Sequence, residues 1–251
     1  MPALARRLLA EFTGTGLLVA VVVGSGIMAQ RLSPGQSGLE LLENTLATAA
    51  GLAVIITVLA PASGAHLNPV VSAADWVLGR RPGTGLPGRE VAAYAAAQTA
   101  GAISGAVLAN LMFALPAATA STTGRSAPHL WLGELATTAG LVLVVFALAR
   151  SGRPALAPAA VAGWIGAAYW ATSSTSFANP AVTIARAFTD TFAGIAPGSV
   201  PVFILAQAAG GALGLGLVLV LYPTARTTAR AEETWPDRET AAAGTVPPAG
   251  N

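Results

Sequence analysis

The sequence contains no cysteine and no lysine, and only 10% of its residues are charged. Without cysteine the chain has no disulfide, no thiolate and no point of haem attachment, and its redox compartment stays open. Soluble domains carry about 25% charged residues, so this charge content argues for a membrane protein. The 13 basic residues are all arginines, scattered between apolar blocks. No basic stripe with interleaved aromatic residues is present, which excludes nucleic acid as a partner.

Residues that carry enzyme chemistry are also scarce. The chain has two histidines, and Glu11 and Glu134 are the acidic residues that lie well inside apolar segments. An enzyme needs a nucleophile with its base, or a set of metal ligands, gathered in one place. The sequence therefore predicts no enzyme, no cofactor and no metal site.

Long apolar segments are what the sequence does contain, and 54% of its residues are hydrophobic. A helix that crosses a bilayer needs ~20 such residues. The run that follows Arg6 and Arg7 has no clear cleavage site, so we expect a first transmembrane helix rather than a removed signal peptide. Residues 223–251 are polar and aperiodic, and we expect a disordered cytoplasmic tail. Six full spans are predicted, at about 8–29, 44–60, 89–113, 130–149, 156–174 and 199–222.

Two short segments begin with the same pair of residues, Asn68-Pro69 and Asn179-Pro180. Asparagine is a preferred N-cap, and proline is favoured at the first helical position. The apolar pattern after each pair is too short to cross a bilayer. We therefore predict two re-entrant half-helices, at about 68–79 and 179–191.

The two halves of the chain resemble each other. Glu11 in the first span corresponds to Glu134 in the fourth, and Gln98 in the third corresponds to Gln207 in the sixth. Each half holds three spans and one half-helix, so the second half must enter the membrane upside down. We predict an all-α membrane protein with an inverted 3+3 repeat. Its parts are the first repeat (1–114), a connecting loop (115–129), the second repeat (130–222) and the tail (223–251).

Arginine placement predicts the orientation, because an excess of arginine marks the cytoplasmic side. Arg31, Arg125 and Arg186 are the arginines expected on the outer side. Both termini are therefore expected in the cytoplasm, with the chain in the plasma (inner) membrane. The arginines expected on the cytoplasmic side are Arg6, Arg7, Arg80, Arg81, Arg89, Arg150, Arg153, Arg226, Arg230 and Arg238.

The two half-helix starts are expected to meet near the midplane of the membrane. Irregular backbone at that depth is tolerated where it lines a water-filled cavity, so 62–67 and 172–178 should line a pore. Helix N-termini carry partial positive charge, so two of them facing one point repel cations and protons while neutral solutes pass. His66 is either a pH-sensitive pore residue or a packed loop residue. The residues expected to line the loops are Gly64, Ala65, His66 and Phe177.

These motifs resemble the aquaporin, or major intrinsic protein, family. They are the two Asn-Pro starts with Val70 and Ala181 after them, the segment 63–69 (Ser-Gly-Ala-His-Leu-Asn-Pro), and the paired Gln-x-x-Gly segments. The resemblance covers about residues 4–222. It implies a homotetramer in which every subunit has its own narrow pore for water or small uncharged solutes.

The departures from that family concern the outer constriction, or selectivity filter. Water-selective members carry an arginine three residues after the second asparagine, and this chain has Val182. Counting from the motifs places Ser176, Ala167 and Thr48 at the other filter positions. A filter of these four residues has no positively charged side chain and no aromatic ring. Its opening should therefore be wider than the filter of a water-selective channel. Arg186 lies one helical turn beyond Val182, and the sequence gives no reason to treat it as a replacement.

The second half-helix resembles the bacterial aquaglyceroporins associated with arsenic resistance, through the segment 179–186 (Asn-Pro-Ala-Val-Thr-Ile-Ala-Arg). That resemblance implies a passive channel for arsenite as As(OH)3, for glycerol-like polyols and for some water. A water-selective channel is the alternative. An ion-coupled transporter is disfavoured, because the half-helix starts carry no ionisable residue. A non-conducting junction protein of the same fold stays open.

Two interpretations apply to the polar residues inside the spans. Glu11 and Glu134 could relay protons, or they could accept hydrogen bonds from the re-entrant loops and hold them in place. The resemblance and the cost of unpaired buried groups favour loop fixing. Gln98 and Gln207 are interpreted in the same way, as amides that fix the loops.

Overall fold

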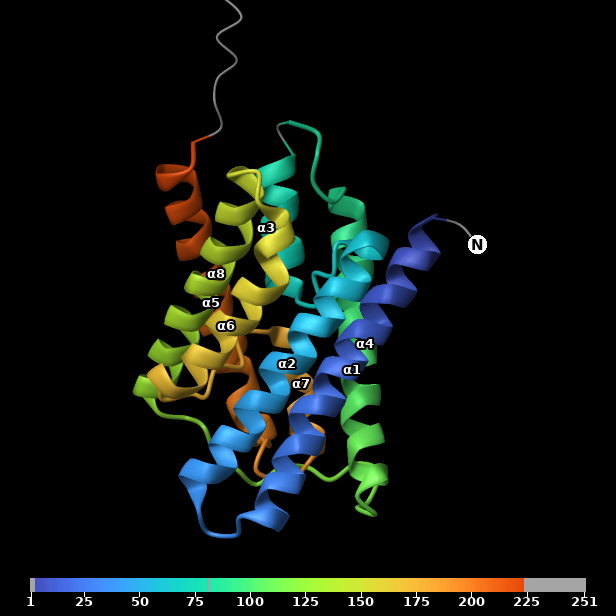
Figure 1. Ribbon diagram of the computed structural model, residues 1–251, viewed down its shortest axis with the longest axis vertical. Helices are drawn as coiled ribbons and strands as arrows, with labels where there is room; N and C mark the ends of the chain where they lie inside the picture. Colours follow the sequence, from blue (N-terminus) through green and yellow to red (C-terminus); the bar gives the residue numbers. More distant parts are fainter. Residues whose placement is uncertain (1–2, 81, 224–251) are drawn as a thin grey trace, which may run out of the picture.

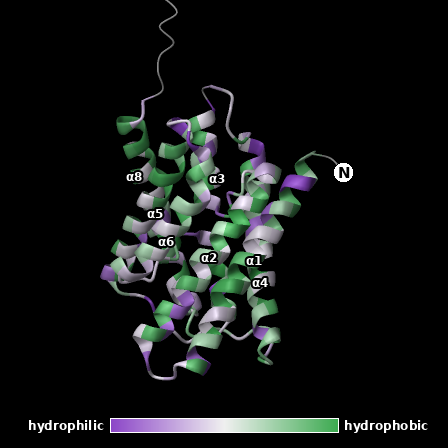
Figure 2. Cartoon of the chain, in the orientation of Figure 1, coloured by the Kyte–Doolittle hydropathy of each residue, from purple (hydrophilic) through white to green (hydrophobic). Residues whose placement is uncertain are grey.

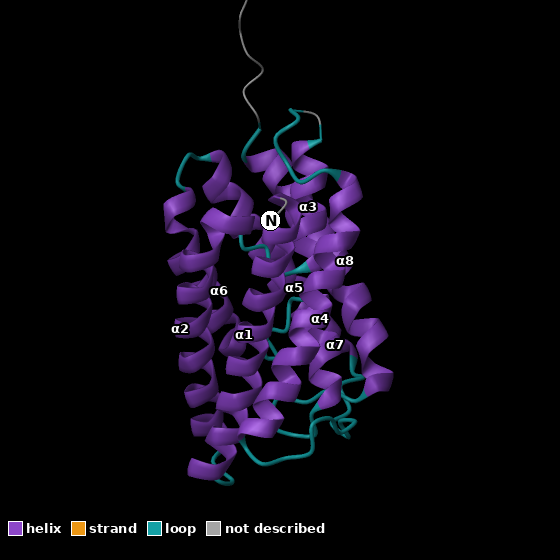
Figure 3. Ribbon diagram, turned by 90° about the vertical axis from the view of Figure 1, so that its right-hand side faces the viewer, coloured by secondary structure: helices purple, strands orange, loops and turns teal. Residues whose placement is uncertain are grey.

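The computed structural model describes residues 3–80 and 82–223, and within these ranges the chain is helical and has no strand (Figures 1 and 3). The α-helices are α1 (Ala3–Leu32), α2 (Ser37–Ser63), α3 (Pro69–Gly79), α4 (Gly88–Met112), α5 (Pro128–Arg150), α6 (Ala157–Ala171), α7 (Pro180–Ala185) and α8 (Val200–Leu221). Short 3-10 turns are η1 (Pro154–Leu156), η2 (Arg186–Phe188) and η3 (Pro197–Ser199). The prediction of an all-α membrane protein is confirmed.

Five of the helices in the described part of the chain are long and apolar enough to cross a membrane: α1, α2, α4, α5 and η3 with α8. The fifth predicted span, at about 156–174, is shorter than expected, because α6 has 15 residues and ends where Thr172 turns extended. The three residues of η1 lead directly into α6. At a rise of ~1.5 Å per α-helical residue and ~2 Å per 3-10 residue, the two together reach about 28 Å. That nearly matches the ~30 Å of a bilayer core.

The half-helices begin where the sequence predicts. Asn68 and Asn179 are extended N-caps, and the side chain of each accepts a hydrogen bond from the backbone N–H two residues later. The predicted end of the second half-helix at 191 is wrong, since α7 ends at Ala185 and η2 at Phe188. Thr189 is extended and donates its hydroxyl to Asn110 Oδ1 on α4, 2.8 Å away. This contact draws the chain away from the helix axis.

The two ends of the bundle hold different elements. The start of α1 and the end of α8 lie at one end, which we call the termini end, and α3 lies in that half of the bundle (Figure 1). α7 lies in the opposite half, near the connections that follow α1 and α4. Hydrophilic residues gather at the two ends and around the re-entrant loops, and hydrophobic residues cover the helices between them (Figure 2). Arg81 and residues 224–251, which include most of the predicted tail, lie outside the described residues.

Two helix pairs cross closely at corresponding glycines of the two halves. A Cβ at Gly101 of α4 would overlap the carbonyl oxygen of Phe12 in α1. A Cβ at Gly210 of α8 would overlap the carbonyl oxygen of Leu135 in α5. Only glycine permits such an approach of two backbones. The matched crossings support the predicted repeat and bring Glu11 and Glu134 toward the centre of the bundle.

Replacing Gly210 with alanine is expected to separate α5 from α8 and to lower the free energy of unfolding by about 1–3 kcal/mol, the usual cost of overpacking. Gly216 on the same helix is the matched control, because a Cβ there meets nothing within 4 Å. Thermal unfolding in detergent measures both variants. Equal melting temperatures for Gly210→Ala and Gly216→Ala would contradict the close crossing.

Candidate pore

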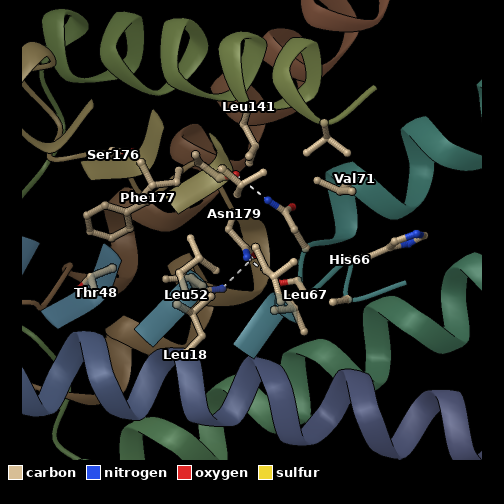
Figure 4. A pocket seen from close by; sticks show the side chains of 18 of the residues that line it. Leu18, Thr48, Leu52, His66, Leu67, Val71, Leu141, Ser176, Phe177 and Asn179 are labelled. Carbon is tan, nitrogen blue, oxygen red and sulfur yellow. Dashed lines mark hydrogen bonds between the residues drawn. The ribbon is translucent and has the colours of Figure 1, made fainter. Parts of the chain in front are cut away.

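A cavity of about 120 Å³ runs between the helices and past both re-entrant loops. It is bounded by α1, α2, α5 and α6 on one side and by the loops with α3 and α7 on the other (Figure 4). Its polar lining residues are Thr48, His66, Asn68, Tyr169, Ser176, Asn179 and Arg186. The rest of the wall is mainly Leu, Val, Ile and Ala, and within residues 3–80 and 82–223 no carboxylate lines it.

The two asparagines hold the loops together at the middle of the cavity. Asn68 Nδ2 donates to the carbonyl oxygen of Ala178, and Asn179 Nδ2 donates to that of Leu67, both at 2.7 Å (Figure 4). Each asparagine oxygen meanwhile accepts from the start of its own half-helix. An amide nitrogen carries two hydrogens, so each asparagine retains one donor for an occupant of the cavity.

Glu11 is completely buried and holds the first loop. Its Oε1 accepts from the backbone N–H of His66 at 3.0 Å, and its Oε2 accepts from that of Leu67 at 2.7 Å. Gln98 Nε2 donates to the same carboxyl group and also to Ser72 on α3. This is the geometry that the loop-fixing hypothesis requires.

Glu134 makes the equivalent contacts with the second loop and is also completely buried. Its two oxygens accept from the backbone N–H groups of Phe177 and Ala178, each at 2.8 Å. Gln207 Nε2 donates to Glu134 at 2.6 Å and to Thr183 on α7 at 2.8 Å. All of these partners belong to the re-entrant segment or to α8, so the contacts join the second loop to α5 and α8.

Both loops contain non-glycine residues with left-handed backbone. The φ angles are 47° at Ala65 and 52° at Leu67 in the first loop, and 57° at Ser176 and 49° at Ala178 in the second. Such conformations cost roughly 1–2 kcal/mol each. The buried carboxyl groups bind the N–H groups of these same segments, which offsets the strain and keeps both loops in one conformation.

Three of the four predicted filter residues lie on the cavity wall, namely Thr48, Ser176 and Val182. The placement of Ala167 is wrong, because its side chain is exposed and absent from the wall. Helix α6 presents residues four apart to the cavity: Ala157, Val161, Ile165 and Tyr169. Ala167 lies between the last two, roughly 200° around the helix from each.

The predicted loop residues Gly64, Ala65, His66 and Phe177 all border the cavity. Pro69, Val70, Pro180 and Ala181 do not, because they form the first turns of α3 and α7 behind the asparagines. His66 lies on the cavity wall and is also packed against α3. It borders the cavity, and its Nδ1 lies 3.1 Å from Ser72 Oγ while its Nε2 lies 3.9 Å from Asp75.

Two polar residues of the wall were not among the predicted site residues. Tyr169 points its hydroxyl at Thr48, 3.5 Å away, and the four-residue spacing of α6 is the signal that would have identified it. Arg186 is only 3% exposed, lines the cavity and donates its Nε to the carbonyl of Ala193. Arg186 follows Val182 by four residues, a spacing that indicates the same helix face. The sequence did not show that this face borders the cavity.

The loop between α4 and α5 packs against the segment that follows α7. Arg125 donates its Nε to the carbonyl of Gly194 at 3.0 Å, and its backbone N–H bonds Ser199. Thr122 donates its backbone N–H and its hydroxyl to Asp190, and these hydrogen bonds lower the pKa of that exposed carboxyl. Among the described residues no group of three or more His, Asp or Glu side chains could hold a metal ion.

Comparisons with known proteins agree with this geometry. The family model of the major intrinsic proteins matches residues 1–173. The aquaglyceroporin AqpS of Rhizobium meliloti is 49% identical over 227 residues, which are 90% of this chain and 94% of that protein. The glycerol uptake facilitator of Pseudomonas aeruginosa is 38% identical over 112 residues, 45% of this chain and 37% of that one.

A solved structure has the same fold. The X-ray structure of the aquaglyceroporin from Plasmodium falciparum superposes with a TM-score of 0.64 at 22% sequence identity, and the match covers 86% of this chain and 95% of that one. The paired asparagines, the buried carboxyl groups and the central cavity agree with these matches. The chain belongs to the major intrinsic protein family, whose aquaglyceroporins are membrane channels and not enzymes.

Proposed function

We propose that the chain is a passive transmembrane channel for small uncharged solutes. These are glycerol-like polyols and arsenite as As(OH)3, with some water, each moving down its own gradient. The observation that carries the proposal is the lining of the cavity. Most of the wall is apolar, and its hydrogen-bonding groups include Asn68, Asn179 and Thr48. In a neutral polyol the carbon atoms can contact the apolar wall, and the hydroxyl groups can form hydrogen bonds with its polar residues. The names of the glycerol facilitator and AqpS relatives support the same solute class.

Exclusion of cations and protons is part of this proposal. Asn68 and Asn179 direct amide donors at the middle of the cavity, and α3 and α7 both begin there. N–H donors and helix starts favour oxygen acceptors over cations at this point. Among the described residues the wall has no carboxylate to attract cations, which supports the same conclusion.

The setting of the channel is proposed as well. We place the termini end in the cytoplasm, because the arginines expected on that side outnumber the others. We propose the plasma (inner) membrane as the location and a homotetramer as the assembly. Cross-linking of the purified protein in detergent tests the assembly, and a product of four chains is expected.

The direct test is flux through proteoliposomes containing the full chain. We expect glycerol and arsenite to enter faster than into empty vesicles, with rates that do not depend on proton or sodium gradients. Stopped-flow light scattering measures glycerol and water, and arsenic analysis of the vesicle contents measures arsenite. Entry of water alone would favour the water-selective alternative. No flux of any of the three would contradict the channel.

A further inference from the structure

The outer part of the cavity contains a buried cation that the family pattern does not place there. The family pattern puts an arginine at position 182, where this chain has valine, and the wall instead receives Arg186. Residues four apart lie on one face of a helix. Arg186 caps the C-terminus of α7, so its charge also lies at the helix end that favours a cation.

The position of the Arg186 guanidinium is defined by its neighbours. Its carbon Cζ lies 3.4 Å from the centroid of the Phe177 ring, and its Nε donates to the carbonyl of Ala193. Phe177 is in turn held by Glu134 through its backbone N–H and by an edge contact with Phe203. A planar guanidinium on an aromatic face with one fixed N–H has little freedom to turn.

A second guanidinium lies near the same aromatic ring. Arg125 Cζ lies 4.9 Å from the centroid of the same Phe177 ring, but Arg125 is not part of the cavity wall. In the described part of the chain, neither arginine has a carboxylate within 4.0 Å. Arg186 is buried and Arg125 is partly buried. The arrangement therefore places positive charge beside the cavity without a direct ion pair.

Hydrogen-bonding capacity is also left over at this place. A guanidinium has five N–H donors, and among the described residues one of those of Arg186 is bonded. Ser176 is 3% exposed, lies on the same wall, and its hydroxyl has no partner within the described structure. Buried polar atoms in folded proteins normally have partners. The cavity wall therefore carries unused N–H donors and an unpaired hydroxyl, and oxygen atoms of a solute are suitable partners for both.

We propose that Arg186 is the specificity-determining cation of the outer pore and replaces the arginine absent from position 182. Its N–H donors and Ser176 Oγ bind the oxygen atoms of a neutral hydroxylated solute. Its charge, reinforced by Arg125, keeps cations out. Phe177 is the positioning residue that holds the guanidinium. This inference rests on the proposed channel function and assigns the charge barrier of the outer pore to a residue outside the Asn-Pro starts.

The test compares Arg186→Gln and Arg186→Lys with wild type in proteoliposomes. A pH-sensitive dye and a potential-sensitive dye report proton and potassium leak, and light scattering reports glycerol. Arg186→Gln is expected to conduct glycerol and to raise cation leak by at least about tenfold, because the local positive charge is lost. Arg186→Lys should keep the leak low while altering the ratio of glycerol to water flux. Arg153→Gln, an exposed arginine at the termini end, is the control and should match wild type.

A folded Arg186→Gln channel that excludes cations as well as wild type would overturn the inference. If Arg186→Gln does not elute as a folded protein, the double variant Val182→Arg with Arg186→Gln is measured instead. Recovery of folding with cation exclusion supports the interchange of the two positions, and no recovery overturns it. A wild-type channel without glycerol flux would contradict the proposed function itself, so the two failures are distinguishable.

Discussion

Replacing Val182 with arginine is expected to reduce glycerol and arsenite flux by at least about tenfold and water flux much less, since a fixed bulky cation is added at the narrow part of the pore. Val182 lies on the wall of the cavity, with Ser176 and Thr48 also on that wall. Arg186 already occupies the same wall one helical turn away, so the new side chain has no empty volume behind it and must extend into the cavity. Stopped-flow light scattering on matched vesicles gives both fluxes.

Val182→Leu is the size control for this prediction. It adds bulk at the same position without charge or hydrogen-bond donors, so glycerol flux should fall less than in Val182→Arg. Equal loss of glycerol, arsenite and water in Val182→Arg would mean that the variant blocks or unfolds the pore. Unchanged glycerol flux would show that the side chain does not enter the solute path.

Replacing Glu134 with alanine is expected to abolish solute flux and to lower the free energy of unfolding by at least about 3 kcal/mol, at about 1–3 kcal/mol for each buried donor that loses its partner. The three donors are the backbone N–H groups of Phe177 and Ala178 and the side-chain amide of Gln207. Without the carboxyl group these three donors lose their acceptor on α5. Thermal unfolding in detergent should show a melting temperature lower by at least about 6 °C, given about 2–4 °C per kcal/mol.

Asp190→Ala is the matched control, because this exposed carboxyl also accepts a backbone N–H, that of Thr122, but its donor can turn to water. It should leave the melting temperature and the flux close to wild type. Glu134→Gln should fall between the two, since it retains one acceptor oxygen. If Glu134→Ala keeps both its flux and its melting temperature, the loop is held by other contacts and the loop-fixing hypothesis is wrong.

Local chemistry made much of this fold predictable. The starts of α3 and α7 follow from asparagine as an N-cap and proline at the first helical position, and both starts lie at the predicted residues. The matched spacing of Glu11 with Glu134 predicted which polar groups would meet the two loops. The end of α7 was missed because it depends on the contact of Thr189 with Asn110, which belongs to a different helix.

The sequence by itself determined the membrane class, the half-helix starts and the pairing of carboxyl groups with loops, because apolar run length, capping and repeat spacing are written along the chain. Only the tertiary structure decided which residues form the outer wall. Counting along α6 selected Ala167, whereas packing turned the helix so that Tyr169 faces Thr48. The position of Arg186 on Phe177 joins segments on both sides of α7. The rotation of a helix and the meeting of distant segments depend on packing against neighbours, and no local pattern encodes them.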